Sequence, residues 1–326
     1  MRYDDWGQRA PRWAGIRSNM TSIAGVPVHY VAAGAGSPAD DAPTHLLVPR
    51  MAGSASSWID LVPRLTALGP VIAVDPPGTV TGHTGAPYRY GPRACVDARF
   101  VRAVIGHLAL DRVVLHGWSM GGLVAALAAD LVPARVTGLV LFAPALPWRR
   151  TARFEQLAWQ TLGRAALAVG APVARAGLRL AGPRALTRKR AAVTGVDVFA
   201  NARGDVLGGD PSLVSPEQVA VYVDDLTTAA QRPGLLVGGV TAFASAMTAM
   251  FVDQQPVLDV LDRLPVPVLL LWGTDDPLVD PPSYQRHAER PGWTPHAVEH
   301  AGHLLPIERP DECVRAVQDW LTRTPD

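Results

Sequence analysis

Short apolar runs alternate with segments of helical periodicity along the first 144 residues of the chain. The apolar runs predict strands at residues 26–31, 44–48, 71–74, 113–115 and 136–142. Between them, apolar side chains recur at helical spacing, which predicts helices at residues 54–68, 93–108 and 120–131. Strands that alternate with helices over short connections are typical of a mostly parallel sheet with helices on both faces. The pattern therefore predicts an α/β fold.

The alternation stops near residue 145 and resumes near residue 257. The stretch between these points has no convincing buried strand, and its pattern predicts helices at residues 151–169, 216–232 and 236–250. After it, the pattern predicts strands at 266–272 and 294–299 and helices at 282–289 and 310–321. We therefore expect a core domain formed by residues 20–144 and 257–326, a helical insertion at 145–256, and a polar leader at 1–19.

The central predicted strand leads directly into the next helix through the sequence Gly-Trp-Ser-Met-Gly. This Gly-x-Ser-x-Gly pattern is typical of a nucleophile elbow, in which Ser119 occupies a strained corner between strand and helix. Gly117 and Gly121 would remove the side chains that collide at such a corner. Ser119 would then lie at a helix N-terminus, where free N–H groups favour developing negative charge. The same pattern also occurs in ordinary turns, so the interpretation requires a base, an acid and oxyanion donors.

Two acidic residues and two histidines qualify as partners of Ser119. In folds with this elbow, the order along the chain is nucleophile, acid, histidine. Asp275 and Asp276 follow the strand predicted after the insertion, so they would lie at the same sheet edge as Ser119, and we favour Asp276. His303 follows the last predicted strand and precedes the last helix, and we favour it over His300 as the base.

The other histidines carry no such pattern. His116 lies inside the central predicted strand, so we expect it to be packed in the core. We expect the remaining ones to be structural or exposed: His29, His45, His83, His107, His287 and His296. Outside the candidate triad, no histidine–carboxylate cluster has the sequence spacing of metal ligands, and we predict neither a metal nor a cofactor.

Three motifs together resemble the α/β-hydrolase superfamily, in particular its capped serine hydrolases, such as small carboxylesterases and lactone or C–C bond hydrolases. They are His-Gly-Trp-Ser-Met-Gly-Gly around Ser119, Trp-Gly-Thr-Asp-Asp-Pro-Leu-Val around Asp276, and Gly-His-Leu-Leu-Pro-Ile-Glu-Arg-Pro at His303. The resemblance covers residues 20–144 and 257–323, and the insertion falls where the family carries its cap. It implies an α/β-hydrolase fold with Ser119, Asp276 and His303 as a catalytic triad. A serine nucleophile argues against the haloalkane dehalogenase and epoxide hydrolase branches, which use a carboxylate there.

The family also has a His-Gly-x segment after an early strand, and its third residue donates a backbone N–H to the oxyanion hole. The matching stretch here is Val-Pro-Arg-Met-Ala-Gly-Ser, in which Pro49 and Arg50 replace the His-Gly pair. The resemblance implies that the backbone N–H groups of Met51 and Met120 form the hole. The replacement alters the expected geometry and adds positive charge near the hole. The segment that begins at Asp75 is a second departure from the family's sequence pattern. We interpret Asp75 itself as a structural loop residue.

The resemblance implies a small-molecule substrate as the partner, and composition excludes other classes of partner. A formal net charge of +1 argues against nucleic acid as the main partner. The N-terminal residues lack the apolar segment of a secretory signal, and no uninterrupted apolar run reaches membrane-spanning length, so we expect a cytoplasmic protein. Cys95 and Cys313 lie far apart and predict neither a disulfide framework nor a metal cluster.

The insertion is basic. Its cations are Arg149, Arg150, Arg153, Arg164, Arg175, Arg179, Arg184, Arg188, Lys189, Arg190 and Arg203. Such a surface fits a lid that touches anionic lipid or an acidic acyl substrate, but it also fits a solvated arginine face on ordinary helices. We favour the solvated face and keep weak contact with a membrane surface or an acyl substrate as the alternative.

These observations predict a serine hydrolase that cleaves an ester-like bond, such as a carboxylic ester or lactone, of a small apolar substrate through an acyl-enzyme. The altered Pro49–Arg50 segment leaves a non-hydrolytic enzyme of the same fold, a lyase, cyclase or acyltransferase, as an alternative. A non-catalytic ligand-binding protein is a further alternative, although such a protein has no need of all three triad residues.

Overall fold

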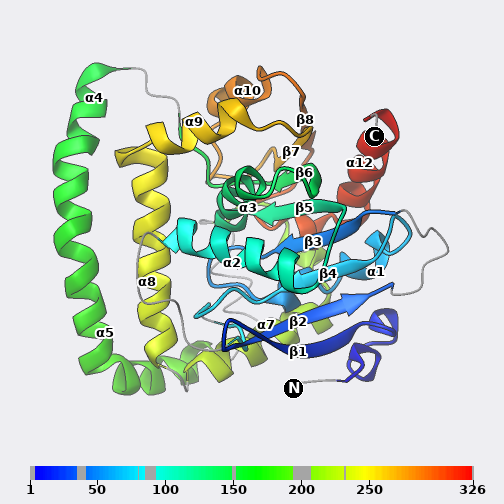
Figure 1. The fold of residues 1–326 in the computed structure, drawn as a ribbon. Coiled ribbons are helices and arrows are strands. Elements are labelled where there is room, and N and C mark those ends of the chain that lie inside the picture. Colours follow the sequence, from blue (N-terminus) through cyan, green and yellow to red (C-terminus); the bar gives the residue numbers. More distant parts are fainter. Residues whose placement is uncertain are drawn as a thin grey trace.

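A single eight-stranded sheet forms the centre of the computed structural model, which describes residues 4–34, 42–79, 81–84, 93–148, 152–193, 207–230 and 233–324 (Figure 1). The strands are β1 (Arg17–Ile23), β2 (Val26–Ala33), β3 (Thr44–Val48), β4 (Val71–Val74), β5 (Val113–Trp118), β6 (Val136–Phe142), β7 (Val268–Gly273) and β8 (Trp293–Val298). Their order across the sheet is β1-β2-β4-β3-β5-β6-β7-β8. β2 is antiparallel to both of its neighbours, and β3 to β8 pair in parallel. The predicted α/β class and mostly parallel sheet are confirmed.

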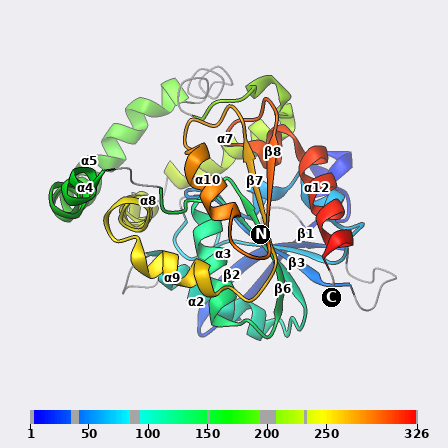
Figure 2. The same ribbon diagram turned by 90° about the horizontal axis from the view of Figure 1, so that it is seen from above.

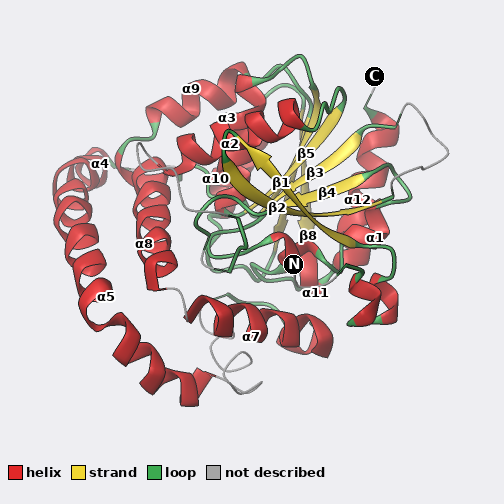
Figure 3. Cartoon of the chain, turned by 60° about the horizontal axis from the view of Figure 1, so that its bottom comes forward, coloured by secondary structure: helices red, strands yellow, loops and turns green. Residues whose placement is uncertain are grey.

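Helices cover both faces of this sheet (Figure 3). One face carries α2 (Arg93–His107) and α3 (Met120–Leu131), and the other carries α1 (Val62–Leu65) and α12 (Pro310–Arg323). α10 (Pro281–Ala288) packs against β8, and α11 (Leu305–Glu308) leads into α12. Every residue of β5 is buried between the two helix layers, which explains why the central strand is an unbroken apolar run rather than an alternating one.

The described residues between β6 and β7 are helical and include no strand. In chain order they form α4 (Arg153–Ala158), a π turn (Trp159–Gly163), α5 (Arg164–Val193), a short 3-10 turn (Pro211–Leu213), α7 (Pro216–Ala230), α8 (Pro233–Met247), a second π turn (Thr248–Val252) and α9 (Gln255–Arg263). α8 lies between the outer α5 and α2 of the core, and α9 packs against α3 (Figures 1 and 2). None of the helices in the described ranges is both long and apolar enough to cross a membrane.

The first segment of the chain differs from the polar leader expected at residues 1–19. From residue 4 onward it packs against the core, with Trp6, Trp13 and Ile16 each at most 2% exposed, and β1 already begins at Arg17. The Trp13 indole N–H donates to Asp60 Oδ1 at 2.7 Å, and the Trp6 indole N–H donates to a serine of β1. A few large aromatic side chains anchor the segment, although its average composition is polar.

The single helix expected at residues 54–68 is divided in two. A 3-10 turn at Ala55–Trp58 is followed by the short helix α1, which has Pro63 in its first turn. Proline lacks an N–H and therefore starts a helix more readily than it continues one. Of the four apolar positions that define the predicted helix, Trp58, Leu61 and Leu65 are fully buried, and Leu68 is partly buried against the core.

Candidate active site

Ser119 forms the corner between β5 and α3 in a strained backbone conformation. Its φ is 54° and its ψ is −121°. A positive φ at a residue with a side chain costs on the order of 1–3 kcal/mol and persists only where the surroundings impose it. The Ser119 N–H donates to Phe142 O at 2.9 Å, and Ser119 O accepts the N–H groups of Gly122 and Ala145, each at 2.9 Å. Bonds on both sides therefore hold the serine at the carboxyl edge of the sheet.

Ser119, His303 and Asp276 form a continuous chain of hydrogen bonds. His303 Nε2 lies 3.0 Å from Ser119 Oγ, and His303 Nδ1 lies 2.8 Å from Asp276 Oδ2. The Asp276 side chain is fully buried and the His303 side chain is 8% exposed. An ionised Asp276 accepts the Nδ1–H, which leaves Nε2 free to accept the hydroxyl proton of the serine. The three residues thus have the relative positions that nucleophile activation requires.

Contacts that the sequence did not suggest hold the backbone of His303 and the segments near the site. The Trp118 indole N–H donates to His303 O at 2.9 Å, and the His303 N–H donates to Leu207 O at 2.7 Å. The buried Tyr284 hydroxyl donates to Pro144 O at 2.5 Å. Burial and the negative charge of Asp276 raise the pKa of Tyr284 well above its ordinary value, so it remains a neutral donor. These contacts join segments that are far apart in the sequence, so no local sequence motif predicts them.

The structure separates the favoured residues from their neighbours in the sequence. His300 Nδ1 lies 3.8 Å from Asp275 Oδ2. The Asp275 side chain is 51% exposed and the His300 side chain is 81% exposed, so both face solvent. The His300 N–H donates to Thr274 Oγ1 at 2.9 Å, a contact within these loops. The structure therefore brings Asp276 and His303, rather than Asp275 and His300, to Ser119.

The two expected oxyanion donors lie on segments in direct contact. Met120 begins α3, and Met51 lies in the loop after β3. A Cβ on Gly121 would lie 2.4 Å from Val48 O, which shows how closely the start of α3 approaches the end of β3. Met51 and Met120 also line one small cavity of about 20 Å³, roughly the space that one water molecule occupies.

Arg50, which replaces the family's glycine, is held between aromatic rings. Its guanidinium carbon lies 5.3 Å from the ring centre of Trp118 and 5.4 Å from that of Tyr222. Its Nη1 also donates to Met51 O at 3.4 Å. Cation–π contacts of this kind fix the side chain, so the loop that carries Met51 gains the restraint that an arginine can provide and a glycine cannot.

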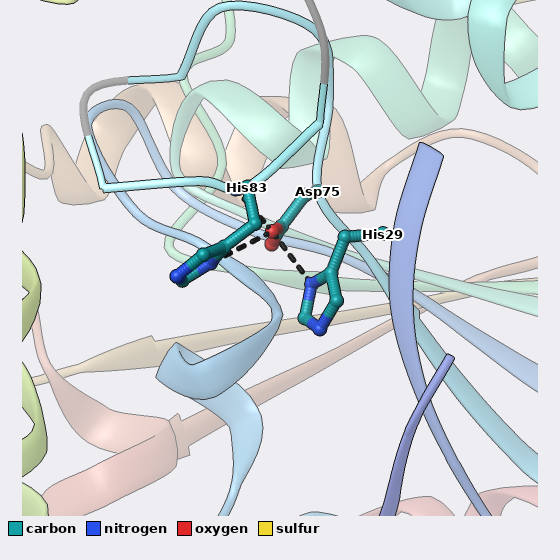
Figure 4. Close-up of side chains that lie close together, drawn as sticks. All are labelled: His29, Asp75 and His83. Atoms are coloured by element: carbon teal, nitrogen blue, oxygen red, sulfur yellow. Dashed lines mark hydrogen bonds and ion pairs between the residues drawn. The ribbon is translucent and has the colours of Figure 1, made fainter. Parts of the chain in front are cut away.

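Asp75 holds a second histidine–carboxylate cluster near the same sheet edge (Figure 4). Its Oδ2 accepts from His29 Nδ1 at 2.8 Å and from the His83 N–H at 2.7 Å, and its Oδ1 accepts the Ala55 N–H at 2.5 Å. Burial alone would raise the pKa of Asp75, but hydrogen bonds from His29 and His83 outweigh it and hold the pKa well below its usual range.

The ring nitrogens of His29 and His83 and the Asp75 carboxylate lie within 4.8 Å of one another, a spacing that metal ligands can adopt. However, N–H donors from three segments already occupy the carboxylate. We interpret the cluster as an anchor that ties the loop after β4 to β2 and to Ala55, in agreement with the structural role expected for Asp75. The two histidines were not expected to meet, because residues 29 and 83 lie in separate segments.

His116 is fully buried in β5, as expected for a core histidine, and it pairs with His45 of β3. His45 Nδ1 lies 2.8 Å from His116 Nε2. Burial lowers the pKa of His45 to about 4 and holds the pKa of His116 well below its ordinary value. Both rings are therefore neutral at physiological pH and belong to the packing of the sheet rather than to the chemistry at its edge.

A larger cavity of about 640 Å³ lies between the core and the helical insertion. Side chains of α2, α3, α5, α8 and α9 line it, and most are alanine, leucine or valine, including Leu123, Leu127, Leu167 and Val257. Arg93 of α2 lines both this cavity and the small one beside Met120. The volume and the apolar lining fit a small-molecule site.

Comparison with known proteins agrees with this architecture. The model of the alpha/beta hydrolase family matches residues 28–316. No curated protein matches the chain. Similar solved structures include the epoxide hydrolase CorEH (TM-score 0.68, 23% identity, 94% of this chain and 99% of that one). A second is the enol-lactonase from Burkholderia xenovorans LB400 (TM-score 0.64, 21% identity, 94% of this chain and 100% of that one). A third is a loop variant of the haloalkane dehalogenase DbeA from Bradyrhizobium elkanii (TM-score 0.66, 21% identity, 95% of this chain and 97% of that one). At these identities the likeness establishes the fold and leaves the reaction open.

Proposed function

Because the chain belongs to the alpha/beta hydrolase family, we propose that it is a serine hydrolase that cleaves an ester-like bond of a small apolar substrate. The observation that carries the proposal is the unbroken hydrogen-bond path from Asp276 through His303 to Ser119 Oγ. The nucleophile position holds a serine, whose hydroxyl forms an acyl-enzyme with a carbonyl substrate. The carboxylate lies in a fully buried position where it can stabilise the charged imidazole.

In the proposed reaction, Ser119 Oγ attacks the substrate carbonyl carbon while its proton moves to His303 Nε2. The carbonyl oxygen becomes an oxyanion, which the backbone N–H groups of Met51 and Met120 stabilise. The tetrahedral intermediate collapses, the bond to the leaving oxygen breaks, and His303 gives its proton to that oxygen. Water then attacks the acyl-enzyme, losing a proton to His303, and the acid leaves as Ser119 regains its hydroxyl proton.

Aliphatic side chains from the core and from the insertion line the larger cavity together, which fits an apolar substrate. Ser119, Asp276 and His303 do not line this cavity, and Arg93 is the residue that connects its wall to that of the small cavity beside Met120. We propose that residues 145–256 act as the cap over this space. If the cap excludes water, the same acyl-enzyme would instead react with another nucleophile, which is the acyltransferase alternative. The altered Pro49–Arg50 segment is the feature that keeps this alternative open.

The proposal is tested by labelling the protein and its Ser119→Ala variant with a fluorophosphonate probe, beside turnover of p-nitrophenyl esters of increasing acyl length. We expect rapid labelling of the wild type and none of Ser119→Ala, because only an activated serine reacts with the probe. We also expect turnover that varies with acyl length. An unlabelled wild type would refute the proposal. Labelling without ester turnover would refute hydrolysis and favour acyl transfer or lyase chemistry.

We also propose that the insertion contacts anionic membrane surfaces. Large apolar side chains are exposed along α4, the π turn and α5: Phe154 (79%), Leu157 (62%), Leu162 (73%), Val169 (65%) and Val173 (64%). Arg153, Arg164 and Arg175 lie on the same helices. Exposed apolar side chains interspersed with arginines are typical of surfaces that bind anionic lipid.

Sedimentation with phosphatidylglycerol vesicles tests this contact. We expect the wild type to sediment with these vesicles but not with phosphatidylcholine vesicles, because the arginines require anionic headgroups. The double variant Phe154→Ser, Leu162→Ser should remain in the supernatant. Leu278→Ser, which changes an exposed apolar residue of the core, is the matched control and should sediment like the wild type. Equal sedimentation of all three proteins would exclude the proposed surface.

A further inference from the structure

Several residues that line the small cavity beside Met51 and Met120 carry buried polar atoms without a hydrogen-bond partner. Eight buried side-chain nitrogen or oxygen atoms in the described residues lack a hydrogen-bond partner, and three of them belong to residues that line this one cavity. They are Arg50 Nε, Thr79 Oγ1 and Asp97 Oδ1. A buried polar atom without a partner costs on the order of 1–3 kcal/mol, and three such atoms in residues that line one cavity call for a further group that completes their hydrogen bonds.

The three residues come from separate parts of the fold. Arg50 lies in the loop after β3, Thr79 in the loop after β4, and Asp97 in α2. Helix α8 of the insertion closes the cavity with Gly238 and Gly239, where a Cβ on Gly238 would lie 2.6 Å from Gly78 O. The cavity therefore exists only when the insertion is seated on the core.

The polar groups are held in place by their other contacts. Arg93 Nε donates to Asp97 Oδ2 at 2.7 Å, and Arg93 Nη2 donates to Pro77 O. The aromatic rings of Trp118 and Tyr222 hold the Arg50 guanidinium. Burial raises the pKa of Asp97 to about 6, with the charge of Arg93 opposing part of that rise, so the carboxylate is ionised above neutral pH.

The residues that line the cavity thus include a donor, an acceptor and a hydroxyl that can act as either. Arg50 Nε–H only donates, ionised Asp97 Oδ1 only accepts, and the Thr79 hydroxyl does both. A volume of about 20 Å³ admits one oxygen atom. A hydroxyl oxygen satisfies the set, because it can donate to Asp97 and accept from Arg50, whereas a methyl or methylene group would leave all three atoms unpaired.

We propose that Arg50, Thr79 and Asp97 form a binding site for a hydroxyl group carried by the acyl part of the substrate. This inference rests on the proposed function, since the site adjoins the backbone groups assigned to the oxyanion hole. It also gives a reason for the replacement of the family's glycine by Arg50, which contributes the donor. The substrate class is then a hydroxyacyl ester or a lactone with a hydroxyl near the carbonyl.

The test compares p-nitrophenyl butyrate with p-nitrophenyl 2-hydroxybutyrate and 3-hydroxybutyrate, each as separate enantiomers, at about pH 8, where Asp97 is ionised. The readout is the ratio of kcat/KM for the hydroxy ester to that for the plain ester. We expect a wild-type ratio of about ten or more for one hydroxy ester, the factor typical of a hydrogen bond to a charged group. Thr79→Val, which is nearly isosteric, and Asp97→Asn, which exchanges an acceptor for a donor, should bring the ratio close to one. In both variants, kcat/KM for the plain ester should change by a smaller factor than kcat/KM for the hydroxy ester.

Thr66→Val is the matched control. Its hydroxyl donates to Pro63 O at 2.6 Å, away from the cavity, so the ratio should stay at the wild-type value. A wild-type ratio near one for every hydroxy ester would overturn the proposal, and a lower rate for all esters in Thr79→Val would then point to a fixed water in the cavity. A high ratio that persists in both cavity variants would overturn it as well. Thermal unfolding of each variant confirms that it is folded.

Failure of the proposed function is distinguishable from failure of this inference. If the wild type turns over neither class of ester, hydrolysis is refuted, and the site is tested by calorimetric titration with butyrate and 3-hydroxybutyrate. Tighter binding of the hydroxy acid, lost in Thr79→Val and kept in Thr66→Val, would support the site independently of catalysis. Equal binding of the two acids to the wild type would overturn it.

Discussion

Replacing Asp276 by asparagine should lower kcat for ester hydrolysis by about 10⁴-fold, with the fold retained. An asparagine can donate to His303 Nδ1, so it would favour the tautomer that has its proton on Nε2. That tautomer cannot accept the proton of Ser119. The substituted side chain keeps its size, and its carbonyl oxygen can still accept the Leu278 N–H that Asp276 Oδ1 accepts at 2.8 Å. Steady-state turnover of p-nitrophenyl butyrate measures the effect.

Asp275→Asn is the matched control, because it makes the same chemical change one residue away. The Asp275 side chain is half exposed, and its contacts are with the exposed His300 and with the Thr274 hydroxyl, which donates to Asp275 Oδ1 at 3.4 Å, so kcat should stay within about twofold of wild type. Circular dichroism and thermal unfolding of both variants separate loss of chemistry from loss of structure. A large loss in Asp275→Asn together with a small one in Asp276→Asn would reverse the assignment of the acid.

This pair of variants also marks the limit of what the sequence predicts about the site. Two adjacent acidic residues, Asp275 and Asp276, follow β7, and the sequence places both at the same sheet edge as Ser119. The choice depends on how the loop turns, which buries Asp276 beneath His303 and leaves Asp275 in solvent. The same argument applies to His303 and His300, which are three residues apart in one loop.

Strands β2 to β8 and most of the flanking helices were predictable because hydrophobic periodicity is a local property of the chain, whereas β1, with its mostly polar residues, was not predicted. Contacts between distant segments leave no such local trace. His29, Asp75 and His83 meet because β2 and β4 pair, and the polar cavity forms because loops after two strands meet α2. The packed N-terminal segment was missed for a related reason. A few buried tryptophans determine its position, whereas its average composition is polar.

The sharp corner between β5 and α3 was expected from the sequence and is present in the structure, and its glycines allow a test of how it is held. A Cβ on Gly117 would lie 2.4 Å from Gly121 O, 2.6 Å from Gly122 Cα and 2.7 Å from Ala125 Cβ. Two of these atoms belong to the backbone at the start of α3, so no rotamer change can relieve the contact. The glycine therefore lets α3 pack directly against β5, next to the corner where Ser119 has its positive φ.

We expect Gly117→Ala to lower the free energy of unfolding by about 3 kcal/mol, the upper part of the usual range for overpacking, and to reduce labelling of Ser119 as the elbow shifts. Gly106→Ala is the matched control, since Gly106 lies exposed in α2 with no atom within 4 Å of the added Cβ. There the same substitution should raise stability by about 0.5–1 kcal/mol, because alanine favours a helix more than glycine does. Urea denaturation of both variants measures the difference. Equal stabilities would mean that α3 can move away from β5, and that the strain at Ser119 does not depend on this contact.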